Sequence, residues 1–216
     1  MGLLYLQSGY LDHAGWVLSL GKAVAPNAPG IHANIGALLF HKSRQSDGDL
    51  QDRVHDAIRA AAAWFEADRI EGGVEVYRAH AAEALDHAAA IGTMPAVPNL
   101  EGLDDAERGL SLPGNAFVGY SGEAACEQLM VVGRNLMNRG RYAVAVGPLS
   151  RIVSDGTSSL VGIAALYLGV THILLGDGGA AEAPLMRAEE VGDSIVRAYS
   201  SFNRLRVARH KAAAPP

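Results

Sequence analysis

The sequence predicts an all-α chain of stacked antiparallel helix pairs, because one glycine-centred pattern recurs along it at intervals typical of helical repeats. In each copy a glycine is followed by a small residue seven positions on, an alanine twelve on and a leucine sixteen on. Full copies begin at Gly2, Gly133 and Gly169, and a copy that keeps only its first half begins at Gly36. Gly2 and Gly36 lie 34 residues apart, and Gly133 and Gly169 lie 36 apart, which is a period at which α-solenoids repeat.

The pattern has a physical explanation in the packing of two helices. Helix axes approach closely only where the side chains are small, as at Gly36 and Ala14, while the leucines fill the gaps between layers. Gly9, Gly140 and Gly176 fall where the first helix of a pair should end, a place that favours glycine. Each pair buries its apolar side only against its neighbours, so at least about three pairs are expected.

Composition supports this fold and excludes other classes of protein. Apolar residues make up 49% of the 216 residues and aromatic residues only 6%, so alanine and leucine must form the core, which favours helices over sheets. The net charge is −5 without a long run of one sign, so nucleic acid is not an expected partner. The single Cys126 excludes an internal disulfide and suits a reducing compartment. Neither a signal peptide nor 18 uninterrupted apolar residues is found, so we expect a cytoplasmic protein without a membrane span.

Helix signals follow one another along most of the chain. Apolar periodicity and glycine breaks predict helices over 2–8, 11–24, 31–42, 50–70, 74–91, 122–139, 141–154, 157–175, 178–191 and 193–210. Asp49 or Asp52 is expected to cap the fourth helix, and Gly72 and Gly73 to end it. In a full pattern the first helix would begin before Gly2, so it is either a stub or part of something longer.

Residues 93–121 separate two helical halves. Proline and glycine punctuate this stretch, and its length far exceeds the usual 2–8 residues between packed helices. It is either a linker or an ordered loop across the groove of the solenoid, and its many apolar side chains favour the packed loop. A short helix is predicted near 103–110. The predicted organisation is therefore 1–92 for N-terminal repeats and a long helix pair, 93–121 for the loop, and 122–211 for C-terminal repeats and a closing helix.

The closing helix, 193–210, has two possible roles. Its apolar residues Ile195, Tyr199, Phe202 and Leu205 are expected to face the core. Its arginines, at 197, 204, 206 and 209, are expected to face outward. A helix with one polar side is what a helical array needs at its end, so a solvated cap is expected. The alternative is a docking patch for an acidic partner.

The repeated residues resemble tetratricopeptide repeats, which place Gly, an aromatic or aliphatic residue, a small residue, Ala, a large apolar residue, Ala and Pro in this order. The residues that carry the resemblance are Gly2, Tyr5, Gly9, Ala14, Leu18 and Pro26 in the first copy, and Gly169, His172, Gly176, Ala181, Leu185 and Ala188 in the last. Residues 1–43 and 124–192 match, whereas Gly21 and the insertion at 46–51 depart from the pattern. The resemblance implies an α-solenoid that binds other proteins.

Catalytic signatures are sparse in this sequence. A Gly-rich phosphate loop, a Gly-x-Ser-x-Gly elbow and a Cys-x-x-Cys pair are all missing. His80, Glu83 and His87 share one helix face, as a metal site requires, but their surroundings favour a solvated face. Asp52 and His55 do not supply a clear further set of ligands. We therefore expect no enzymatic activity, no cofactor and no bound metal.

The resemblance also implies where a partner binds, because the first helix of each pair lines the concave face in this family. The residues expected to face a partner are Asn34, Phe40, His41, Arg134, Met137 and Asn138. Asn34 matches an asparagine that some members use to hold a peptide carboxylate, but the basic partners of that clamp are missing, so a mixed apolar groove with Arg134 is expected. The predicted function is a scaffold or adaptor for a partner protein or extended peptide. The alternative is a helical accessory or regulatory subunit, or region, of a larger enzyme or complex.

Overall fold

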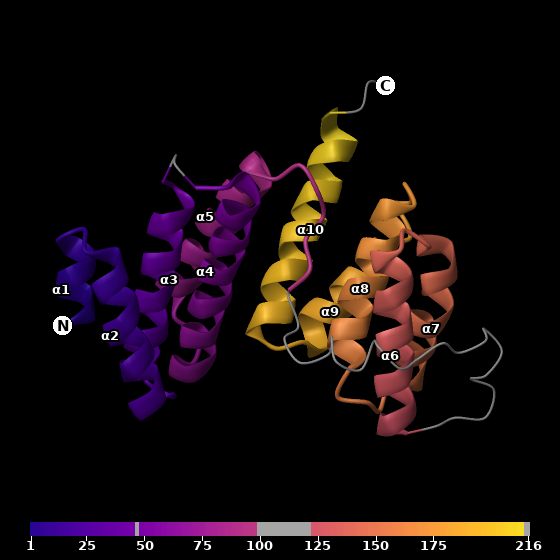
Figure 1. Cartoon of the computed structure of the whole chain (residues 1–216), viewed down its shortest axis with the longest axis horizontal. Helices are drawn as coiled ribbons and strands as arrows, with labels where there is room; N and C mark the ends of the chain where they lie inside the picture. Colours follow the sequence, from indigo (N-terminus) through magenta and orange to yellow (C-terminus); the bar gives the residue numbers. More distant parts are fainter. Residues whose placement is uncertain (46–47, 99–121, 214–216) are drawn as a thin grey trace. The chain divides into compact units, whose positions relative to one another are not determined.

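The described part of the chain is all-helical. A computed structural model describes residues 1–45, 48–98 and 122–213, and within these ranges all ten elements are α-helices (Figure 1). They are α1 (Gly2–Gln7), α2 (Leu11–Val24), α3 (Pro29–Ser43), α4 (Leu50–Glu71), α5 (Glu75–Ile91), α6 (Glu123–Asn138), α7 (Tyr142–Asp155), α8 (Val161–Leu174), α9 (Glu182–Val191) and α10 (Ser194–Ala213). Every predicted helix outside the loop is found. The largest differences are the starts of α8 and α9, each four residues later than predicted.

The chain forms two compact units, Met1–Met94 and Pro95–Pro216. The predicted helix 103–110 and the predicted packing of the loop lie outside the described residues. The segment 95–98 is described and belongs to the second unit. None of the described helices is both long and apolar enough to cross a bilayer.

In unit 1 (Met1–Met94), α1 to α5 pack against one another in chain order (Figure 1). The Asp49 side chain caps α4, because its Oδ1 accepts hydrogen bonds from the backbone of Gln51 at 2.8 Å and Asp52 at 3.4 Å. Gly72 ends α4 in the left-handed conformation, with φ +89°. One boundary differs from the prediction, since α3 begins at Pro29 rather than at residue 31, and the first turn of a helix suits proline.

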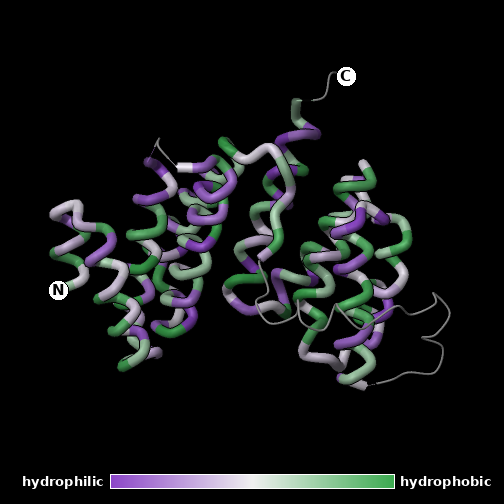
Figure 2. Tube along the Cα trace, viewed as in Figure 1, coloured by the Kyte–Doolittle hydropathy of each residue, from purple (hydrophilic) through white to green (hydrophobic). Residues whose placement is uncertain are grey.

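In unit 2 (Pro95–Pro216), α8 is the most deeply buried helix. It packs against α6, α7, α9 and α10, and an unbroken run of its residues, 164–171, is buried. Polar side chains of a helix that is buried on several sides need hydrogen-bond partners within the protein. Thr171 finds one on its own helix, where its Oγ1 donates to the Tyr167 carbonyl at 2.7 Å. Apolar and polar residues are interspersed along the helices of both units (Figure 2).

The repeated pattern produces the same contact in three helix pairs. A methyl group added to the glycine would lie within 2.8 Å of the leucine sixteen residues on, so a larger residue would force the leucine or the helix to shift. The pairs are Gly2 with Leu18, Gly133 with Leu149, and Gly169 with Leu185, at 2.8, 2.7 and 2.5 Å. The leucine thus lies on the glycine of its own pair.

The predicted turn glycines are confirmed. Gly9, Gly140 and Gly176 have φ of +79°, +70° and +80° just after α1, α6 and α8. Residues with a Cβ rarely adopt this backbone conformation, so glycine is favoured at each reversal of the chain.

The prediction for the closing helix is correct only in part. Tyr199 and Phe202 are buried, but Ile195 is 45% exposed and its neighbour Val196 is buried instead. Two of the arginines expected to face outward, Arg204 and Arg206, are half-buried. Arg204 is fixed by carboxylates of α9, at 2.9 Å from Glu182 and 2.7 Å from Glu189. The inner part of α10 thus carries ion pairs with α9 as well as apolar residues.

Candidate functional site

Three of the residues predicted to bind a partner lie together in unit 1. Asn34, Phe40 and His41 of α3 line a cavity of about 440 Å³ that α4 and α5 complete. The other described residues of its lining are Ala33, Ala37, Arg44, Trp64, Val76, Tyr77, His80 and Glu83. A cavity of this size lies within the range of ligand-binding pockets.

The floor of this cavity is aromatic. Trp64 of α4 is only 4% exposed, and the Phe40 ring meets it edge-on, with 5.8 Å between the ring centres and 72° between the planes. The His80 ring also lies against the indole, with 5.2 Å between the ring centres and 30° between the planes. The Phe40 ring also meets His87 edge-on at 5.7 Å. Such ring pairs fix one another's orientation, so the cavity presents a preformed apolar surface.

Gly36 explains why Trp64 can occupy this position. A methyl group on Gly36 would lie 2.8 Å from Cε2 of the indole, so only glycine lets α3 approach the ring this closely. In the full copies of the pattern a leucine covers the equivalent glycine, whereas here a tryptophan of the following long helix does so. The interrupted copy of the repeat therefore gives unit 1 an aromatic ring at the place where the other copies have an aliphatic side chain.

Polar groups surround the aromatic floor. The Arg44 guanidinium lies over the Phe40 ring, 5.6 Å from its centre, which is within cation–π range. The His80 Nδ1 lies 3.9 Å from a Glu83 carboxylate oxygen. The Tyr77 hydroxyl donates to a Glu71 carboxylate oxygen at 2.8 Å, and this hydrogen bond is the main reason why the pKa of Tyr77 is raised. The cavity thus combines an apolar floor with cationic, acidic and hydroxyl groups at its edge.

His80, Glu83 and His87 are not brought together into one group of ligands. Nowhere in the described ranges are three or more His, Cys, Asp or Glu side chains arranged to hold a metal ion. His80 lies on Trp64, whereas His87 packs on Phe40 and its Nε2 lies 3.4 Å from the Ser43 carbonyl oxygen. The two imidazoles are therefore held on two different rings.

The other three predicted residues, Arg134, Met137 and Asn138, lie on α6 of unit 2. Asn138 is exposed, but Arg134 and Met137 are buried, with 6% and 7% of their surface exposed. The Met137 sulfur lies 3.1 Å from Thr171 Oγ1, because this part of α6 packs against α8. These two side chains are therefore not exposed as the expected groove would require.

The sequence alone missed a second group in unit 2, centred on Asn203. This residue is fully buried on α10, where its Oδ1 accepts from the Ala96 amide at 3.1 Å and its Nδ2 donates to the Ala96 carbonyl at 2.7 Å. The Tyr167 hydroxyl also donates to the Pro98 carbonyl at 3.3 Å. The extended segment 95–98 thus runs along α10, held through its main chain (Figure 1).

Comparisons of this chain with protein families, with curated proteins and with solved structures find no match.

Proposed function

We propose that this chain is a tetratricopeptide-like scaffold that binds an extended segment of a partner protein in the aromatic cavity of unit 1. The observation that carries the proposal is the convergence of Asn34, Phe40 and His41 on a cavity floored by Trp64. These residues come from two helices, α3 and α4, so the packing of neighbouring helices forms the surface. The proposal includes no enzymatic step, no cofactor and no nucleic acid, and places the protein in the cytoplasm.

The chemistry of the cavity favours a peptide with an apolar or aromatic side chain. The half-buried Phe40 ring, packed on the buried Trp64, offers an apolar surface to such a side chain, and Arg44 and Glu83 at the edge can pair with charges on either side of it. The Asn34 amide can both donate and accept, which suits the peptide main chain. Unit 2 supplies an internal precedent, since the Asn203 amide holds the main chain of Ala96 in this way.

The proposal is tested with peptides selected from a random library against the purified chain. We expect Phe40→Ala to weaken the selected peptides about thirtyfold, as truncation of an interface anchor costs about 2 kcal/mol. The matched control is Tyr10→Ala, an exposed aromatic of the same unit outside this cavity, which should bind as the wild type does. Because Phe40 is half-buried, His41→Ala, which changes an exposed side chain, tests the same cavity with less risk to folding.

Fluorescence gives an independent measurement. Trp64 is in the cavity floor and Trp16 is 67% exposed on α2, so a Trp16→Phe background isolates the signal of the cavity. Peptide binding should then change the Trp64 emission. Selected peptides that bind Phe40→Ala and His41→Ala normally and leave Trp64 emission unchanged would place the interface elsewhere.

A second candidate, a helical subunit or region of a larger assembly, is favoured by the outer face of α2. Trp16 and Leu20 are exposed there, at 67% and 49%. At the matching positions of the repeat, the second helix α7 carries Gly147 and Arg151, which are also exposed. An apolar pair at a position that is otherwise small or charged suggests contact with another protein. Trp16→Arg should abolish such an assembly in light scattering while leaving peptide binding to the unit 1 cavity unchanged.

A further inference from the structure

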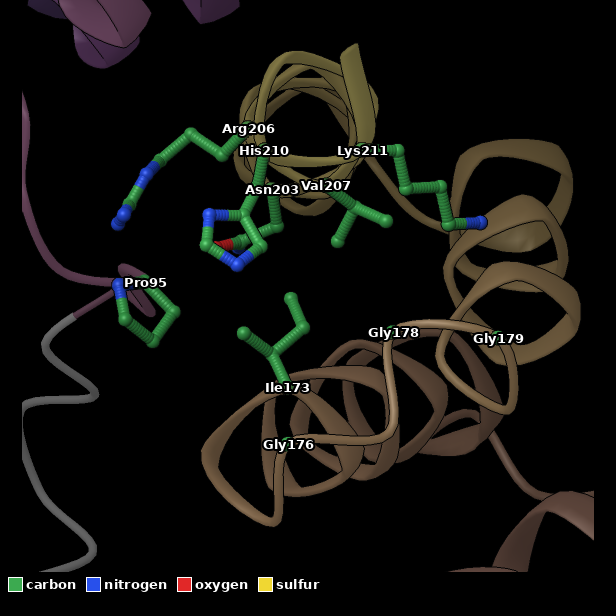
Figure 3. A pocket seen from close by; sticks show the side chains of 10 residues that line it. All are labelled: Pro95, Ile173, Gly176, Gly178, Gly179, Asn203, Arg206, Val207, His210 and Lys211. Atoms are coloured by element: carbon green, nitrogen blue, oxygen red, sulfur yellow. The ribbon is translucent and has the colours of Figure 1, made fainter. Parts of the chain in front are cut away.

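A second cavity, of about 410 Å³, lies in unit 2 between α10 and the loop that follows α8 (Figure 3). Its titratable side chains are Arg206, His210 and Lys211 of α10, and the described residues of its lining include neither Asp nor Glu. In Figure 3 the Arg206 side chain extends to the side of Pro95, and the Lys211 side chain extends in the opposite direction. The cavity thus has a cation at each flank and an imidazole between them.

The middle of the same cavity is apolar. Ile173 of α8 and Val207 of α10 point toward each other across it (Figure 3), and Val207 is 7% exposed. Inorganic phosphate or sulfate would leave these aliphatic groups without a partner. The lining therefore fits an organic anion that carries an apolar group between its charges.

Glycines shape the loop wall of the cavity. A methyl group on Gly178 would lie 3.3 Å from the Val207 Cγ1, so glycine lets the loop approach α10. The one acidic residue of this turn, Asp177, has its carboxylate engaged within the loop, where Oδ1 accepts from the Ala180 amide at 2.9 Å. The loop wall therefore presents main chain to the cavity.

The opposite wall is held by the Asn203 clamp. Pro95 belongs to the extended segment that Asn203 fixes through both main-chain groups of Ala96, and Asn203 Nδ2 also donates to the Tyr199 carbonyl at 2.8 Å. Pro95 is thus a fixed wall of the cavity. Its position also shows that this side of α10 accepts extended main chain, in line with the extended ligand of the proposed function.

Burial makes the charge of Arg206 costly. Desolvation lowers the pKa of Arg206, and the guanidinium lies 5.9 Å from the centre of the Phe202 ring. A carboxylate brought into the cavity beside Arg206 can form a charge-assisted hydrogen bond with its guanidinium.

We propose that this cavity binds an acidic peptide segment, with an apolar side chain between Ile173 and Val207 and carboxylates directed to Arg206 and Lys211. The shared chemistry is two carboxylates that flank an apolar group, which a free aliphatic dicarboxylate could also supply. The proposal rests on the proposed function for the choice of a peptide, but it concerns unit 2 only. If this proposal fails, the proposal that unit 1 binds a peptide is not affected.

The test is a titration of the full chain, labelled with ¹⁵N, followed by amide chemical shifts. The probes are acetyl-Glu-Leu-Glu-amide, its neutral analogue acetyl-Gln-Leu-Gln-amide, and adipate as the free dicarboxylate. The acidic peptide should shift the amides of the loop glycines Gly176, Gly178 and Gly179, while Gly9 and Gly72 of unit 1 serve as internal references. Its affinity should fall as sodium chloride is added, because the recognition is ionic.

Variants connect the shifts to the cavity. Arg206→Gln and Lys211→Gln should each weaken the acidic peptide at least threefold, whereas Arg209→Gln, which removes a charge from α10 outside the cavity lining, should bind as the wild type does. Lys211 is exposed, so its variant remains informative if Arg206→Gln melts early. Phe40→Ala, which tests the unit 1 cavity, should leave this titration unchanged.

Several outcomes would overturn the proposal. Equal binding of the neutral peptide would show that charge does not matter, and unshifted loop glycines would show that the cavity is not the site. If adipate binds as tightly as the acidic peptide, the ligand is a small dicarboxylate and the peptide assignment is wrong. If Arg209→Gln loses as much affinity for the acidic peptide as Arg206→Gln does, the effect comes from the general charge of α10 rather than from the cavity.

Discussion

The helix pairs α1–α2 and α8–α9 share one packing contact but differ in what surrounds it. In both, a leucine of the second helix lies on a glycine of the first, Leu18 on Gly2 and Leu185 on Gly169. The first helix of unit 1 packs against α2 and α3, whereas α8 packs against four helices of unit 2. The repeat pattern thus specifies the contact within a pair, but not how deeply that pair is buried.

Matching positions on the two first helices show the size of this difference. Leu4 of α1 is 62% exposed, whereas its counterpart in the repeat, Thr171 of α8, is fully buried. The apolar residue is therefore the exposed one and the polar residue the buried one, and Thr171 satisfies its hydroxyl on the Tyr167 carbonyl. Coverage by neighbouring helices, rather than residue type, decides burial at this position of the repeat.

Removing the leucine should have the largest effect of the substitutions that test this comparison. Leu185→Ala should lower the free energy of unfolding by about 2–5 kcal/mol, because Leu185 is fully buried and the helices around α8 restrict relaxation into the cavity left behind. Leu18→Ala should cost less, since α1 has only six residues and can move toward α2.

Chemical denaturation followed by two signals measures this difference. Circular dichroism reports both units, whereas both tryptophans, Trp16 and Trp64, lie in unit 1. The loss of stability in Leu185→Ala should therefore be seen by circular dichroism, which includes unit 2. The loss in Leu18→Ala should be seen by tryptophan fluorescence, which reports unit 1. Equal losses of unfolding free energy in the two variants would contradict the idea that coverage by neighbouring helices sets the cost of removing the leucine.

Adding a methyl group to the glycine should have the next largest effect. Gly169→Ala should cost about 1–3 kcal/mol, because the new Cβ would lie 2.5 Å from Leu185 Cγ. Gly2→Ala should cost less, as α1 can shift away from Leu18. The double variant Gly169→Ala with Leu185→Ala should lose less than the sum of the single losses, because the shorter side chain removes the clash. Strict additivity in this cycle would show that the contact is not the cause.

Most of the fold could be predicted because its signals are local. Gly140 and Gly176 fix helix ends through their own φ, and Asp49 caps α4 through its neighbours' amides, so a short stretch of sequence is enough to place each boundary. The face of α10 was harder to predict. Val196, rather than Ile195, faces the core, in register with the buried Tyr199 and Asn203 of the same helix.

The candidate site could be predicted only where the repeat remains regular. Asn34, Phe40 and His41 follow from the register of α3, and all three line the cavity. Trp64 and Tyr77 lie beyond the insertion that interrupts this copy, so the repeat gives no register for them. The Asn203 clamp joins residues 107 positions apart in sequence, and a contact of that range leaves no local pattern.

The smallest expected effect is a gain in stability rather than a loss. It tests whether glycine is needed only where an added methyl group would lie closer than 3 Å to a leucine. Gly15 is inside α2, and a methyl group there would lie 3.6 Å from Leu38 Cδ2, an ordinary van der Waals contact. Glycine within a helix costs about 0.5–1 kcal/mol relative to alanine, so Gly15→Ala should stabilise unit 1 by up to that amount. Its matched control is Gly2→Ala in the same helix pair, and tryptophan fluorescence during denaturation reports both variants. If Gly15→Ala destabilises unit 1 as much as Gly2→Ala does, the loss at Gly2 reflects a general intolerance of this pair rather than the contact with Leu18.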